Sequence, residues 1–95
     1  MVVKKFSATW CSPCKVYAKT FERVEKMDDF KDVKFEVYDV DSDEGEDLAV
    51  KYQIRSVPTT IILDDDENVI GKIIGNVQES VLVKALKDNM SEKKQ

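Results

Sequence analysis

The sequence is organised around one hexapeptide, Trp-Cys-Ser-Pro-Cys-Lys at residues 10–15, which holds the only two cysteines of the chain. Apolar residues in the segment 2–8 predict a strand before it, and apolar residues at helical spacing predict a helix over residues 12–27 after it. The cysteines therefore lie where a strand passes into a helix. Ser12 suits the N-cap of that helix, and Pro13 suits its first position, where no backbone donor is needed.

This placement predicts different roles for the two thiols. The free N–H groups and the positive end of the helix dipole face Cys11, which stabilises a thiolate there. A thiolate is the nucleophile in thiol–disulfide exchange. Cys14 lies one helical turn further on, close enough to attack a mixed disulfide formed at Cys11. We therefore interpret Cys11 as the attacking thiol and Cys14 as the resolving thiol.

Composition narrows the class of protein. The 95 residues suffice for a single domain, 1–95, and 42% hydrophobic with 36% charged residues fit a soluble globular chain. The net charge of −4, without a basic block, argues against a nucleic-acid partner. Histidine, the commonest metal ligand and general base, is absent. No apolar run approaches the roughly 20 residues that span a bilayer. Because no signal peptide precedes the first strand, we expect a cytoplasmic protein.

Strand signals recur after the first helix. Residues 33–40 alternate apolar and polar side chains, which predicts a strand. Residues 59–63 are β-branched and apolar, as in a buried strand. Residues 69–74 return after the turn at 64–68 as an antiparallel hairpin partner.

Two further helices are predicted from capping signals. Asp43 with Glu46, and Asn76 with Glu79, each match a capping box ahead of apolar residues. The element order is then βαβαββα, an α/β fold whose strand–helix–strand unit pairs its strands in parallel. The polar tail, residues 91–95, is expected to fray.

With these elements in place, the sequence resembles the thioredoxin family. The hexapeptide at 10–15 looks like the family's Trp-Cys-Gly-Pro-Cys-Lys active site, Val57-Pro58-Thr59 resembles its cis-proline loop, and Gly75 resembles the glycine that ends its last strand. Most thioredoxins carry a further strand and helix before this core, and this chain begins where those would end. The resemblance implies a thioredoxin-like fold with three helices, the second on one face and the others on the opposite face, around a four-stranded mixed sheet ordered 33–40, 2–8, 59–63, 69–74.

The resemblance also implies a function and a site. The function is that of a protein-disulfide reductase acting on protein disulfide substrates, re-reduced by a thioredoxin reductase, monomeric, and without a cofactor other than its own redox-active disulfide. Trp10 is expected at the surface beside the sulfurs, and a cis bond before Pro58 would place the Val57 backbone where a substrate strand can pair with it. The implied residues are catalytic Cys11 and Cys14, with Trp10, Ser12, Pro13, Val57, Pro58 and Gly75 supporting the site or binding substrate.

One position departs from the family. Thioredoxins usually have a buried acid six residues before the first cysteine, thought to handle the proton of the resolving thiol, and this chain has Lys5. A buried ammonium would favour thiolate, a neutral amine would act as a base, and a long stem would instead carry the charge to solvent. By topology the nearest acid is Asp39. We expect Lys5 to contact Asp39 or the active-site water and to lower the pKa of Cys11, which makes Lys5 and Asp39 the expected pKa-modulating residues.

Several other functions stay open at this stage. The two cysteines supply only half of a structural zinc site, and a purely structural disulfide would close a very short loop. A glutathione-dependent, glutaredoxin-like reductase shares this shorter core, although Trp10 and Pro13 favour a thioredoxin. A secreted oxidant or isomerase, and a non-catalytic binding module, are the remaining alternatives.

Overall fold

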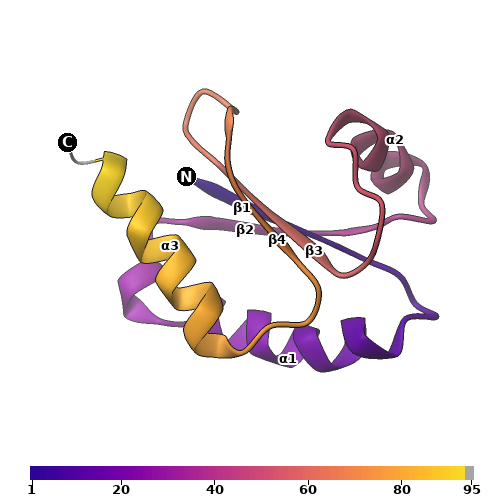
Figure 1. Cartoon of the computed structure of the whole chain (residues 1–95), viewed down its shortest axis with the longest axis horizontal. Coiled ribbons are helices and arrows are strands. Elements are labelled where there is room, and N and C mark those ends of the chain that lie inside the picture. Colours follow the sequence, from indigo (N-terminus) through magenta and orange to yellow (C-terminus); the bar gives the residue numbers. More distant parts are fainter. Residues whose placement is uncertain (94–95) are drawn as a thin grey trace.

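The structure is a computed structural model that describes residues 1–93. Figure 1 shows a twisted sheet with helices on both faces. The predicted order is confirmed, with one added turn of 3-10 helix, η1. The elements are β1 (Val2–Ser7), α1 (Ser12–Glu25), η1 (Asp28–Phe30), β2 (Lys34–Asp39), α2 (Asp43–Lys51), β3 (Thr59–Leu63), β4 (Val69–Ile74) and α3 (Glu79–Lys93).

The sheet has the predicted strand order, β2-β1-β3-β4. β1 pairs in parallel with β2 and antiparallel with β3, and β3 pairs antiparallel with β4. Val3 in β1 thus lies between Phe35 in β2 and Ile62 in β3. All five residues of β3 are buried, as its β-branched sequence predicts for a central strand.

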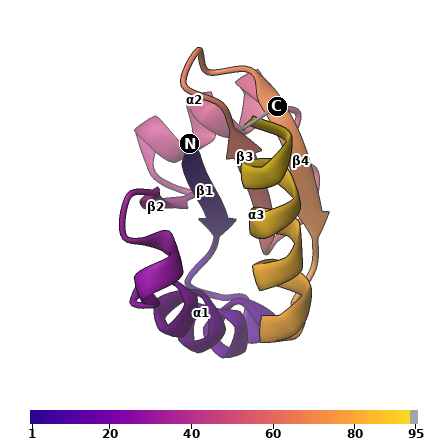
Figure 2. The same ribbon diagram turned by 90° about the vertical axis from the view of Figure 1, so that its left-hand side faces the viewer.

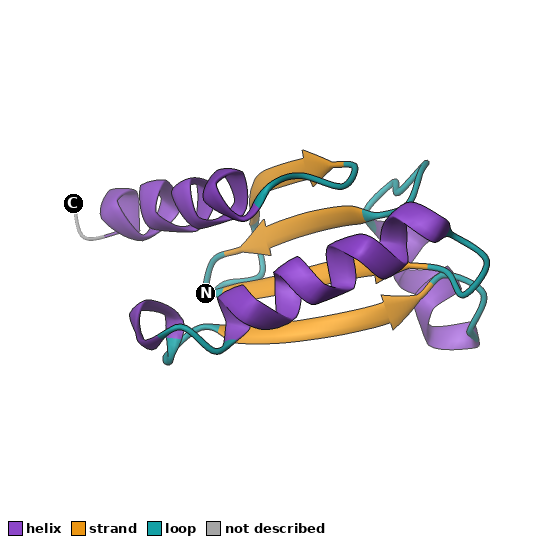
Figure 3. Cartoon of the chain, turned by 90° about the horizontal axis from the view of Figure 1, so that it is seen from below, coloured by secondary structure: helices purple, strands orange, loops and turns teal. Residues whose placement is uncertain are grey.

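The two faces of the sheet have separate cores. In Figure 1, α2 lies on the opposite side of the sheet from α1, and Figure 2 shows α3 alongside β4. Figure 3 shows α1 crossing the face that it shares with α3. Successive β1 side chains point to opposite faces, so Val3 joins the α1/α3 core and Phe6 joins the α2 core. The first core also contains Tyr17, Phe21, Val24, Phe30, Ile62, Leu82 and Leu86; the second contains Ile61 and Leu63, with Leu48, Ala49 and Tyr52 against them.

The helix caps differ from the predicted capping boxes. The Ser42 hydroxyl accepts from the Gly45 N–H at 3.0 Å, so Ser42 rather than Asp43 is the N-cap of α2. At α3 the Leu82 N–H donates to the Gln78 carbonyl, which places the helix start later than Asn76 allows. Both boxes were wrong: at α2 the side chain of the preceding residue reaches the free N–H, and α3 starts three residues after Asn76, at Glu79. The tail predicted to fray at 91–95 is helical to residue 93, and residues 94–95 lie outside the described residues.

No helix within residues 1–93 is long and apolar enough to cross a membrane.

A polar cluster joins the first two strands on the α2 face. Lys4 Nζ donates to Glu36 Oε1 at 2.6 Å, and the Tyr38 hydroxyl donates to the same oxygen at 2.7 Å. These hydrogen bonds, first from Lys4 and then from Tyr38, lower the pKa of Glu36 from 4.5 to about 2. The carboxylate therefore stabilises the pairing of β1 with β2.

We expect the free energy of unfolding of Glu36→Gln to fall less steeply than that of the wild type as the pH is lowered below 4.5. The folded-state pKa of Glu36 is depressed, so its contribution is fully present above pH 4.5 and is lost as pH falls through about 2. The contribution is on the order of 1 kcal/mol, because the pair keeps contact with solvent. Urea unfolding at a series of pH values measures it, with the exposed Glu22→Gln as control. Equal acid slopes in wild type and Glu36→Gln would contradict the assignment.

Candidate functional site

The site lies where β1 passes into α1. Cys11 has extended backbone angles (φ −94°, ψ 109°), and its sulfur accepts a hydrogen bond from the Cys14 N–H at 3.2 Å. Cys11 is therefore itself the N-cap of α1, and the prediction of Ser12 was wrong by one residue. Ser12 becomes the first helical residue and Pro13 the second, still within the turn where a missing N–H leaves no hydrogen bond unmade.

The two cysteines form a disulfide that is largely shielded from solvent. Their Cα atoms are 5.2 Å apart, and Cys11 and Cys14 are 5% and 3% exposed. They pack with Ala8 against Val40 and Val57. The helix N-terminus thus directs a backbone N–H at Cys11, the sulfur predicted to be the nucleophile.

The loop before β3 lies against this disulfide. The Val57–Pro58 bond is cis, as expected, and the Val57 carbonyl oxygen is 3.7 Å from Cys11 Sγ. The Thr59 hydroxyl donates to the Ser56 carbonyl at 2.7 Å and holds the turn together. Residues 46 positions apart in the chain are in this way brought into contact.

Gly75 supports the same loop from β4. Its N–H donates to the Pro58 carbonyl at 2.8 Å, and its φ is +96°, a conformation that favours glycine. The structure therefore brings Gly75 to the loop, as the resemblance implies.

Trp10 lies at the surface, as predicted. Its side chain is 69% exposed, and its indole N–H donates to Asp41 Oδ2 at 2.8 Å. Sequence reasoning missed Asp41, because nothing local links residues 31 positions apart. Trp10 also borders a pocket of about 180 Å³, whose other lining residues are Val40, Ala49, Ile54, Arg55, Ser56 and Val57.

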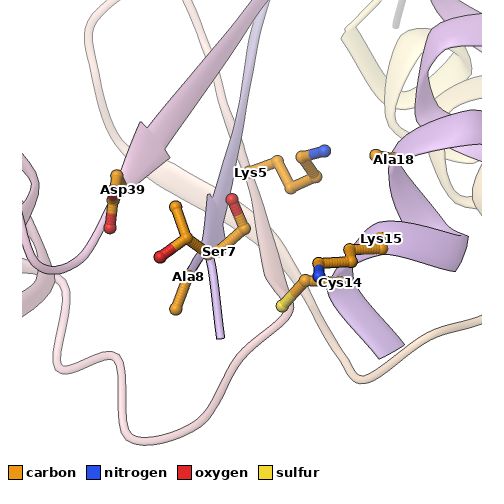
Figure 4. Close-up of a pocket in the computed structure, with 8 residues that line it drawn as sticks. Lys5, Ser7, Ala8, Cys14, Lys15, Ala18 and Asp39 are labelled. Carbon is orange, nitrogen blue, oxygen red and sulfur yellow. The ribbon is translucent and has the colours of Figure 1, made fainter. Parts of the chain in front are cut away.

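The side chain of Lys5 does not make the contact predicted for it. It is only 4% exposed, and its Nζ lies 5.0 Å from the centre of the Phe21 ring on α1. Figure 4 shows the ammonium directed towards Ala18 and away from Asp39. The expected contact with Asp39 was therefore wrong: the two side chains line one pocket, but the stem lies against α1. Contact with water in that pocket stays a prediction.

Burial lowers the pKa of Lys5, while attraction to Glu22 and Glu25 on α1 opposes the shift. No side-chain nitrogen or oxygen in the described chain is buried without a hydrogen-bond partner. Since no hydrogen bond or ion pair of Lys5 is seen within residues 1–93, its Nζ is not completely buried. The stem is thus buried while the charged end keeps some accessible surface, which is compatible with the snorkelling interpretation.

Comparisons with known proteins all find thioredoxins. The family model described as Thioredoxin matches residues 1–88. Thioredoxin from Mycoplasmoides gallisepticum is 38% identical over 86 residues, which are 90% of this chain and 81% of that protein. Thioredoxin Asp f 29 from Aspergillus fumigatus is 35% identical over 74 residues, which are 78% of this chain and 64% of that protein. The chain thus spans less than two thirds of the Aspergillus relative.

Solved structures give the same result. Oxidised mitochondrial thioredoxin 3 from Saccharomyces cerevisiae superposes with a TM-score of 0.78 at 36% identity, covering 92% of this chain and 76% of that one. Thioredoxin 1 from Thermosipho africanus superposes with a TM-score of 0.80 at 25% identity, covering 100% of both chains. The family-model match includes the hexapeptide, the loop at residues 57–58 and Gly75.

Proposed function

The chain belongs to the thioredoxin family of thiol–disulfide oxidoreductases, and on that premise we propose that it reduces disulfides of protein substrates by dithiol–disulfide exchange. The observation that carries the proposal is the Cys11–Cys14 disulfide at the N-terminus of α1, with the Cys11 sulfur 3.7 Å from the Val57 carbonyl and next to exposed Trp10.

The reaction runs in two exchanges. In the reduced protein the Cys11 thiolate attacks one sulfur of the target disulfide; a bond forms between them, and the second target sulfur leaves as a thiolate that takes up a proton. The Cys14 thiolate then attacks the Cys11 sulfur and releases the first target sulfur. The target gains two electrons and two protons, and the protein loses the same number as its own disulfide forms.

The helix N-terminus prepares Cys11 for the first exchange. The Cys14 N–H that donates to Cys11 Sγ at 3.2 Å is one of the free donors of α1, and a hydrogen bond to an ionised sulfur is stronger than one to a thiol. The local field at the start of α1 favours the same ionised form. The reactive form of Cys11 is thus stabilised by backbone alone.

The loop at Val57 supplies the docking groups. An extended target segment that pairs with the Val57 backbone lies directly over Cys11, and Trp10 and the pocket beside it offer apolar area to a neighbouring target side chain. Backbone pairing carries little sequence information. We therefore propose a broad range of protein disulfide substrates.

The partners follow from the same chemistry. We propose that a thioredoxin reductase restores the dithiol, with its own flavin and NADPH, and that this domain uses no cofactor besides the Cys11–Cys14 couple. We further propose that it works as a monomer in the cytoplasm, without binding nucleic acid or membrane.

Insulin reduction tests the proposal. We expect the protein to precipitate the insulin B chain when thioredoxin reductase and NADPH supply electrons. Turnover with glutathione but not with the reductase would show a glutaredoxin-like reductase instead. If the protein supports no reduction with either electron source, and does not accelerate the reduction by dithiothreitol over dithiothreitol alone, a binding module remains and the proposal is overturned.

A further inference from the structure

A second pocket lies beside the resolving cysteine. It has a volume of about 180 Å³ and shares no lining residue with the pocket next to Trp10. Figure 4 shows Lys5 entering it from β1 and Cys14 from α1. This volume is large enough for several water molecules. The full lining is Lys5, Ser7, Ala8, Thr9, Cys14, Lys15, Ala18 and Asp39.

The mechanism above gives Lys5 no role, yet its placement is unfavourable for folding. An ammonium on a side chain that is 4% exposed loses part of its hydration, and within residues 1–93 no carboxylate forms a hydrogen bond or ion pair with it. The ring of Phe21, 5.0 Å away, offers only a weak attraction. A positive charge without a fixed anionic partner is thus held in the pocket that Cys14 also lines.

We propose that Lys5 acts through Cys14: its ammonium stabilises the thiolate that Cys14 can form on reduction, so that the reduced protein is favoured over the disulfide. This inference rests on the proposed function only in taking the Cys11–Cys14 pair as a redox couple. It makes Lys5 a positioning residue that sets the redox potential and helps Cys14 resolve mixed disulfides.

The direction in which Lys5 shifts the redox equilibrium depends on which redox state carries negative charge on sulfur. The disulfide is neutral, so the ammonium gains nothing from the sulfurs in the oxidised state. Reducing the disulfide with two electrons and two protons gives two thiols, either of which can ionise, and the positive charge attracts only the ionised form. Lys5 therefore lowers the free energy of the reduced state alone. Water in the open pocket screens the attraction and keeps the effect modest.

No other charged group around the pocket can stabilise a Cys14 thiolate as Lys5 can. Glu22 and Glu25 on α1 attract the ammonium, and this attraction opposes the lowering of the pKa of Lys5 by burial. Asp39 at the end of β2 repels a thiolate, and Lys15 on α1 is exposed, so its charge is screened. On the other side of β1, β3 places uncharged Thr60 opposite Lys5.

Redox equilibration with glutathione measures the effect. Lys5→Met removes the charge and keeps the length of the side chain; Lys19→Met, on the exposed side of α1, makes the same change in net charge away from the pocket. We expect Lys5→Met to shift the equilibrium towards the disulfide by up to about tenfold, or about 30 mV towards a more negative potential. We expect no shift for Lys19→Met. Equal potentials in the two variants would overturn the inference.

Titration of Cys14 alone gives an independent readout. In a Cys11→Ser background Cys14 is the only thiol, and its thiolate absorbance can be followed against pH. We expect its titration midpoint to rise by up to about one pH unit when Lys5→Met is added, and to stay in place with Lys19→Met. If Lys5→Met does not fold, Lys5→Gln removes the same charge. An unchanged midpoint in the folded variant would contradict the inference.

Neither readout needs a protein substrate. Insulin reduction can fail while the glutathione equilibrium still responds to Lys5, which would overturn the proposed function alone. Normal insulin reduction with identical potentials in Lys5→Met and Lys19→Met would overturn the role of Lys5 alone.

Discussion

Replacing Cys14 with serine will convert the protein into one that captures target disulfides and does not release them. The Cys11 thiolate still attacks, because its hydrogen bond comes from the backbone N–H of residue 14, which serine retains. The second exchange cannot occur, because serine supplies no thiolate. Cys11→Ser removes the nucleophile, so reduction falls to the background rate. Insulin turbidity measures the loss, and mass spectrometry under non-reducing conditions detects the adduct.

The double variant Cys11→Ser/Cys14→Ser is the matched control, since it forms no adduct and keeps both side-chain volumes nearly unchanged. The opposite pattern, with adducts on Cys11→Ser and normal turnover by Cys14→Ser, would reverse the two roles. The structure favours the first assignment, because Cys11 lies beside the Val57 carbonyl while Cys14 faces the pocket that contains Lys5.

The part of the site that is local in sequence could be predicted from it. A strand, a Cys-x-x-Cys pair and a helix follow one another within a short segment, so Cys11 and Cys14 could be assigned from spacing and helix polarity. The family resemblance added Val57, Pro58 and Gly75, which the structure brings to the same place.

Contacts that depend on side-chain direction could not be predicted. Alternation along β1 identifies the face of Lys5, but a long flexible stem can turn either way from there. It lies along Phe21, where its methylene groups are buried, rather than towards Asp39. The cap of α1 was misplaced for a related reason: Ser12 is the usual residue type, but the Cys11 sulfur is the group that reaches the free N–H.

A close contact between α2 and the end of β2 was also invisible in the sequence. The Asp39 carbonyl accepts hydrogen bonds from the Ser42 N–H at 3.0 Å and the Ser42 hydroxyl at 2.7 Å. Gly45, one turn into α2, packs against the same carbonyl: a Cβ added there would lie 1.8 Å from its oxygen. The absence of a side chain at Gly45 thus sets how closely α2 approaches the strand that leads to the site.

Gly45→Ala will destabilise the fold, although helix propensity alone predicts a gain of about 1 kcal/mol. The added methyl group meets backbone, which cannot rotate away, so we expect a loss of about 3 kcal/mol and a fall in Tm of more than about 10 °C. Thermal unfolding followed by circular dichroism measures it. Gly71→Ala is the control: the nearest atoms to its Cβ would belong to the Ile62 and Asn89 side chains, at 3.1 Å and 3.3 Å, so the added methyl group needs a displacement of only a few tenths of an ångström. A Gly45→Ala protein as stable as wild type would show that α2 does not pack this closely against the end of β2.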